Sequence, residues 1–193
     1  MRRRLCIVLL LLPAAAFWPG AATAAYWVDG GTPAEQATVR AGLAASSFPW
    51  QIVHAQVRIH IRPGVLSHAV PGEIWLDSDL LDAGRFSWAV IQHEFAHQVD
   101  FFLLNDVSRA ELAARLGGVT WWSSTRYALA PDGSLAHGQL TAERFASTLT
   151  WAYWPCRANI LRPESPTDES AALPPSEFRA LLGSLLVLPA SHP

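Results

Sequence analysis

The sequence predicts an α+β fold in which a small twisted sheet is backed by helices. Residues 56–62 and 73–77 alternate apolar and polar side chains with the period of a half-buried strand. Residues 85–104 contain neither glycine nor proline and are apolar on most sides. Such a segment is typical of a largely buried helix. We expect this helix to lie across the floor of the sheet.

Local signals place the elements before this helix. Thr32 and Glu35 have the spacing of a capping box, which predicts a helix over residues 33–46. The strand at 56–62 follows, and the shorter strand at 73–77 is expected near the edge of the sheet.

Three more helices are expected after residue 104. Ser108 and Glu111 also have capping-box spacing, so a short helix is predicted to start at Ser108. Thr141 is the expected N-cap of a helix over residues 142–154. A last helix is predicted over residues 176–187.

The first 25 residues have the features of a secretory signal peptide. Three arginines near the start precede an apolar run that is too short to span a bilayer. Small residues before Tyr26 provide a cleavage site. We therefore expect residues 26–193 to form one exported domain, secreted to the medium or the cell envelope.

The net charge of the exported domain excludes two classes of binding partner. Without the leader, lysines and arginines fall from 14 to 11 against 16 acidic residues, so the net charge falls from −2 to −5. Nucleic acid and anionic membranes are therefore not expected partners.

The cysteine content limits how the exported domain can be stabilised. Without the leader, Cys156 is the only cysteine, so no internal disulfide can form. The core, a metal or a partner must stabilise this domain.

A metal-binding pattern lies within the long apolar segment. His93 and His97 are four residues apart, so a helix would present both imidazoles to one ion. Glu94, between them, could touch a water on that metal and take its proton as the water attacks a carbonyl. Burying these polar groups in an apolar helix would be costly unless a metal or partner compensates them. The pattern predicts a Zn²⁺ site with Glu94 as the catalytic base.

A third ligand must come from elsewhere in the chain. Asp100 and Leu103 stand where the metzincin pattern has glycine and histidine, which excludes that class. Glu111 is explained by its expected capping box with Ser108. Among the downstream carboxylates, Glu143 remains as the candidate ligand.

The segment Glu143-Arg144-Phe145-Ala146 resembles the second motif of gluzincins, and it begins 46 positions after His97. Together with the first motif, it resembles the peptidase domain of the anthrax lethal factor-like group, over residues 88–151. The resemblance implies a zincin-like fold and a zinc metallopeptidase that hydrolyses peptide bonds. It also implies that Glu143 joins His93 and His97 as a zinc ligand, and that Ala146 is small so that two helices can approach.

The chain departs from this family at two places. Ser147 stands where the family usually has an acidic residue that holds a histidine, and we expect Asp100 to take over part of that role. The family also has a tyrosine shortly before the second motif that stabilises the oxyanion. Here His137 is the candidate oxyanion donor, with Tyr127 as a substitute.

Two other functions remain open. The chain could be a secreted zinc-binding interaction protein, a pseudo-peptidase whose zinc is structural, or a hydrolase of cell-wall amides. For the peptidase, we expect a peptide or protein substrate that adds to the edge strand of the sheet. The sequence does not indicate an oligomeric state.

Overall fold

The computed structural model describes residues 26–122 and 137–186. The expected signal peptide and Tyr127 lie outside these residues. The described residues form one mixed four-stranded sheet and six α helices, so the α+β class is confirmed. None of the described helices is both long enough and apolar enough to cross a membrane.

The sheet has the strand order β1-β2-β4-β3. The strands β1 (Tyr26–Gly30), β2 (Val57–Arg62) and β4 (Glu73–Asp77) are parallel, and β3 (His68–Val70) runs antiparallel to β4. The strands at 56–62 and 73–77 are thus confirmed. As expected, the strand at 73–77 lies near the edge of the sheet, and β3, which pairs with its outer side, forms the edge itself. With only three residues, β3 is too short for an alternating pattern to reveal it.

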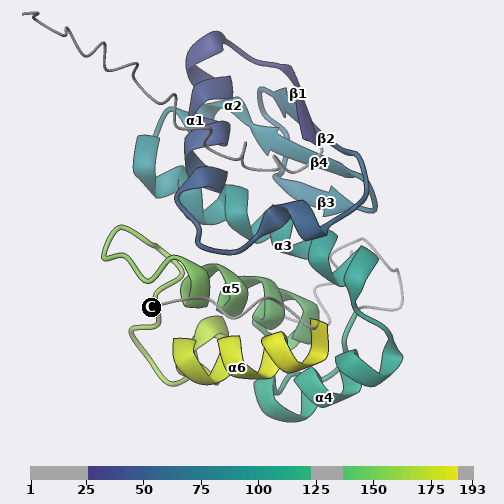
Figure 1. The fold of residues 1–193 in the computed structure, drawn as a ribbon. Helices are drawn as coiled ribbons and strands as arrows, with labels where there is room; N and C mark the ends of the chain where they lie inside the picture. The colour runs from purple at the N-terminus through teal and green to yellow at the C-terminus, as the bar shows by residue number, and fades with distance from the viewer. Residues whose placement is uncertain (1–25, 123–136, 187–193) are drawn as a thin grey trace, which may run out of the picture.

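Helix α3 (Ser87–Leu103) confirms the long helix predicted over 85–104, after a 3-10 turn at Gly84–Phe86. In Figure 1, the sheet and helices α1 (Pro33–Ala44) and α2 (Ser78–Leu81) lie on one side of α3. Helices α4 (Asp106–Leu116), α5 (Thr141–Tyr153) and α6 (Pro175–Leu186) lie on the other side. The chain also forms 3-10 turns at Trp50–Ile52, His137–Gln139 and Glu169–Ala171.

The hydrophobic core joins the sheet to the central helix. Ile59 of β2 and Ile74 of β4 alternate with more polar neighbours and are buried against Phe95 of α3. Helix α1 begins at the expected capping box of Thr32 and Glu35.

The side chain of Gln98 on α3 forms hydrogen bonds with the edge of the sheet. Its side-chain carbonyl accepts a hydrogen bond from Gly72 N at 2.8 Å, and its amide donates to Val70 O at 2.9 Å and to Glu73 O at 3.3 Å. These bonds hold the turn between β3 and β4 against α3.

Two helix starts differ from the sequence predictions. Helix α4 begins one turn early, because Asn105 is the N-cap and Ser108 forms the other half of the capping box. Glu111 therefore has no capping role and is exposed. Helix α5 has Leu140 as its N-cap, whereas the Thr141 hydroxyl donates to Gly117 O at the end of α4. In each case an upstream residue bonds the side chain that was expected to cap the helix: Asn105 for Ser108, and Gly117 for Thr141.

Candidate metal centre

Two buried histidines lie side by side on α3. His93 is 7% exposed and His97 is 4% exposed, and their Nε2 atoms are 3.2 Å apart. The helix dictates this pairing, since residues four apart lie on the same face. Two imidazole nitrogens at this distance must share a proton or an ion.

Glu143, in the first turn of α5, completes a triangle of donor atoms with this pair. Its Oε2 lies 3.0 Å from His93 Nε2 and 3.2 Å from His97 Nε2. Tetrahedral zinc with bonds of about 2.0–2.1 Å separates its ligands by roughly 3.3–3.4 Å. The three atoms are therefore spaced much like one face of such a tetrahedron.

His137 approaches the same carboxylate from the 3-10 turn before α5. Its Nε2 is 3.0 Å from Glu143 Oε2, and its ring stacks on His93 with centroids 5.9 Å apart. Ligand atoms of His93, His137 and Glu143 all lie within 4.8 Å of one another, so this group of two histidines and a glutamate could hold a metal ion. His97 adds a further nitrogen beside it.

The charges of these residues depend on one another. Burial alone would raise the pKa of Glu143, but the charge of His97 and hydrogen bonds from the three histidines hold it well below its usual range. Hydrogen bonds to Glu143 and then to Glu169 raise the pKa of His137 to about 10. His137 is therefore a cationic hydrogen-bond donor in this arrangement.

Glu94 is the second buried carboxylate at this site, and it is 7% exposed. Burial raises its pKa to about 7, and the charge of Glu143 adds to this effect, whereas His93 and His137 oppose it. A carboxyl group in this range can take up and release a proton near neutral pH.

A cavity of about 600 Å³ adjoins these residues. His93, Glu94 and His137 contribute to its lining, and Val90, Ile160 and Leu161 make part of it apolar. The cavity therefore offers a place where a bound molecule can contact both Glu94 and His137.

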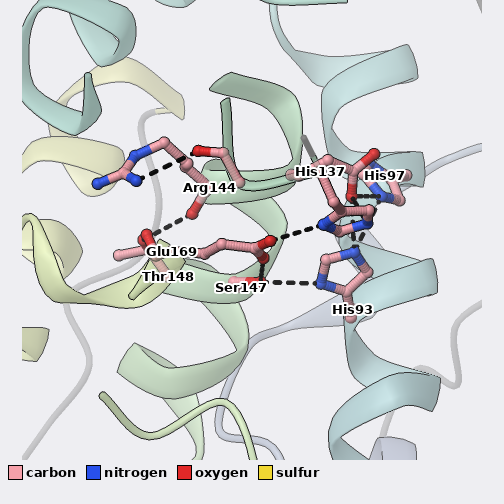
Figure 2. A network of polar contacts seen from close by, with 9 residues as sticks. His93, His97, His137, Arg144, Ser147, Thr148 and Glu169 are labelled. Atoms are coloured by element: carbon pink, nitrogen blue, oxygen red, sulfur yellow. Dashed lines mark hydrogen bonds and ion pairs between the residues drawn. The ribbon is translucent and has the colours of Figure 1, made fainter. Parts of the chain in front are cut away.

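Ser147 and Glu169 connect two of the histidines through their outer nitrogens. Ser147 Oγ lies 3.2 Å from His93 Nδ1 and donates to Glu169 Oε2 at 2.7 Å. Glu169 Oε1 lies 2.6 Å from His137 Nδ1 (Figure 2). Burial alone would raise the pKa of Glu169, but hydrogen bonds from His137 and Ser147 lower it.

Sequence reasoning missed Glu169, because it lies 22 positions from Ser147 in a segment without a recognisable motif. The sequence contained only an indirect indication of a second carboxylate at the site. A serine where the resembled family has an acid suggests that a carboxylate comes from elsewhere.

The orienting role expected for Asp100 is wrong. Asp100 is fully buried and accepts hydrogen bonds from Arg109 Nε at 2.7 Å and Trp121 Nε1 at 2.9 Å. Among the described residues, the buried Nδ1 of His97 has no hydrogen-bond partner. Arg109 and Trp121 occupy the two oxygens of this carboxylate, and the bond from the Arg109 guanidinium is a strong, charge-assisted one.

The fold and the site together define an α+β protein with a group of two histidines and a glutamate that could hold a metal ion. Comparison of the chain with models of known protein families, with curated proteins and with solved structures gives no match.

Proposed function

We propose that this protein is a secreted zinc-dependent metallopeptidase of the gluzincin type. The observation that carries the proposal is the triangle of His93 Nε2, His97 Nε2 and Glu143 Oε2, with sides of 3.0 to 3.2 Å. Glu94 lines the cavity beside it. Few arrangements other than a bound cation explain two buried imidazoles and a carboxylate at this spacing.

The donor set fits zinc, since imidazole nitrogen and carboxylate oxygen are its usual ligands in catalytic sites. His93, His97 and Glu143 would hold the ion. When bound, zinc would polarise the substrate carbonyl and make a water more acidic.

The protein's own groups would then move the protons. Glu94 accepts a proton from water as the water oxygen bonds to the peptide carbonyl carbon. His137 donates a hydrogen bond from Nε2 to the oxygen that becomes negative. Glu94 then gives the proton to the amide nitrogen as the C–N bond breaks, releasing a carboxylic acid and an amine, and the acid proton passes to the amine to give a carboxylate and an ammonium group.

An extended peptide would lie along β3. This strand is at the edge of the sheet, and Gln98, the residue after His97 on α3, holds its end against that helix. Backbone pairing at an edge strand binds peptides of varied sequence. The apolar side chains of the cavity would accept an apolar residue of the substrate.

One observation favours a second function, a zinc-binding interaction protein. His137 Nε2 reaches Glu143 as closely as His93 does, so His137 could act as a fourth protein ligand. Four protein ligands are typical of a structural zinc site, which has no position for water.

Metal analysis combined with peptide hydrolysis separates the two functions. We expect one zinc per wild-type chain and loss of zinc in His97→Ala and Glu143→Ala. Glu94→Gln should keep zinc and lower kcat by about 10²–10⁴-fold, because only the proton acceptor is removed. Peptide mixtures analysed by mass spectrometry provide the assay, and exposed Glu111→Gln is the control.

Undiminished zinc in Glu143→Ala would contradict the ligand assignment. If the wild type binds zinc but cleaves no peptide, and Glu94→Gln changes nothing, the interaction protein is the better explanation.

A further inference from the structure

We propose that Glu169 is a positioning residue that orients two histidines of the site at once, His93 through Ser147 and His137 directly. The inference rests on the proposed function, since it concerns a zinc ligand and the oxyanion donor of that site. One carboxylate would thus orient both histidines, although two separate residues could do the same.

The donors and acceptors permit one consistent direction. The Ser147 hydroxyl donates to Glu169 Oε2, so its oxygen is free to accept from His93 Nδ1–H. Glu169 Oε1 accepts from His137 Nδ1–H at 2.6 Å. Both chains of hydrogen bonds therefore end on the same carboxylate.

This direction determines what the other ring nitrogens can do. A hydrogen on Nδ1 leaves Nε2 of His93, the atom that faces Glu143 and His97, as the nitrogen that can bind a metal ion. Metal-bound histidines normally donate their outer N–H to an acceptor of this kind. His137 lies between two carboxylate oxygens, with Nδ1 2.6 Å from Glu169 Oε1 and Nε2 3.0 Å from Glu143 Oε2, so the bond to Glu169 fixes the direction in which Nε2 points.

The packing around Glu169 holds it in place. Ser147 is fully buried, and the Glu169 side chain is 24% exposed. A Cβ on Gly138 would lie only 3.1 Å from Glu169 Cγ, so the glycine after His137 allows this close approach. In Figure 2, Glu169 extends toward His137 and Ser147.

Ser147 and Glu169 together replace the acid expected at position 147. The serine side chain carries no negative charge itself, but it is short enough to leave room for Glu169 and donates a hydrogen bond to it. An aspartate at position 147 would reach His93 directly and would serve that histidine alone. The relay through serine is therefore what allows one carboxylate to serve both rings.

The test measures zinc affinity by competition with a chelator, and kcat at saturating zinc. Glutamine at position 169 keeps the shape of the side chain, but its NH2 group replaces one of the two carboxylate oxygens that accept from His137 and Ser147, so one of these donors faces another donor. We expect Glu169→Gln to weaken zinc binding by about 10–100-fold and to lower kcat as well. Ser147→Ala should weaken zinc binding but lower kcat much less, because His137 keeps its partner.

Rescue distinguishes positioning from general structural damage. In the double variant Ser147→Asp with Glu169→Gln, the new aspartate should restore zinc affinity to within a few-fold of wild type, whereas kcat should stay low. Glu164→Gln, an exposed glutamate of the same segment, is the matched control and should behave as wild type. Thermal melts establish that each variant is folded.

Ring ¹⁵N NMR of the zinc-free protein tests the relay without turnover. Nδ1 of His93 and of His137 should carry hydrogen in the wild type, and Glu169→Gln should change both signals, while Ser147→Ala changes only that of His93. The proposal is overturned if folded Glu169→Gln leaves zinc affinity and both ring signals as in wild type. A wild type that binds zinc but cleaves nothing would count against the peptidase and not against the relay.

Discussion

Asp100 is a fully buried carboxylate whose charge is compensated from two directions. Arg109 and Trp121 donate to its two oxygens, and Arg109 also reaches its backbone carbonyl at 2.9 Å. The residue thus joins α3 to α4 and to the segment that precedes α5. Its task is to hold these segments together, although it lies only three positions from His97.

At this scale, we expect Asp100→Asn to lower the free energy of unfolding by about 3 kcal/mol, because it removes one partner of a buried ion pair. Zinc affinity should stay within about threefold of wild type, since no ligand loses a hydrogen bond. Urea unfolding and chelator competition measure the two quantities. Exposed Asp106→Asn is the control, and a tenfold loss of zinc affinity in folded Asp100→Asn would contradict this assignment.

The two helices that carry the candidate ligands are α3 and α5, and they pack against each other. Ala146 of α5 is completely buried in the core, one turn after Glu143. A small residue at such a position lets two helices approach closely. The position of Glu143 relative to His93 therefore depends on the packing of the whole helix.

At the scale of the element, Ala146→Leu should lower the free energy of unfolding by about 1–3 kcal/mol, because a filled core cannot accept a larger side chain without movement. Zinc affinity should fall as well, since displacement of α5 moves Glu143 away from the histidines. Thermal unfolding and zinc titration test this. The same change at exposed Ala114 of α4 should alter neither property, and unchanged zinc affinity in Ala146→Leu would show that α5 can adjust.

The candidate metal centre lies between α3 and α5. Its residues come from α3, from the 3-10 turn at His137 and from α5. The sheet, α1 and α2 lie on one side of α3, and α4, α5 and α6 lie on the other (Figure 1). A bound ion would therefore link parts of the chain that are separated by about fifty residues in the sequence.

For the whole molecule, we expect zinc to raise the melting temperature. An ion that binds only the folded state at a hundred times its Kd adds about 2.7 kcal/mol. For a chain of this size, that corresponds to a rise of roughly 5–11 °C. Calorimetry with zinc, and then with a chelator, measures the change. Glu143→Ala should show little of it, and an unchanged melting temperature in the wild type would contradict a metal site that joins α3 to α5.

The sequence by itself determined the features that lie within one element. The spacing of His93, Glu94 and His97 placed all three on one helix, and that helix was expected from its apolar composition. The strands at 56–62 and 73–77 followed from alternation along the chain. These patterns could be read because helix and strand periods act between near neighbours. Glu143 was reached by elimination and resemblance, and the structure brings its carboxylate to the histidines.

Only the tertiary structure decided which distant groups meet. Glu169 reaches Ser147 and His137 because its segment packs against α5, and no spacing in the sequence encodes that approach. Asp100 binds Arg109 instead of a histidine, because α4 brings a guanidinium to it. Hydrogen bonds between separate elements depend on how those elements pack, and packing is a property of the assembled core.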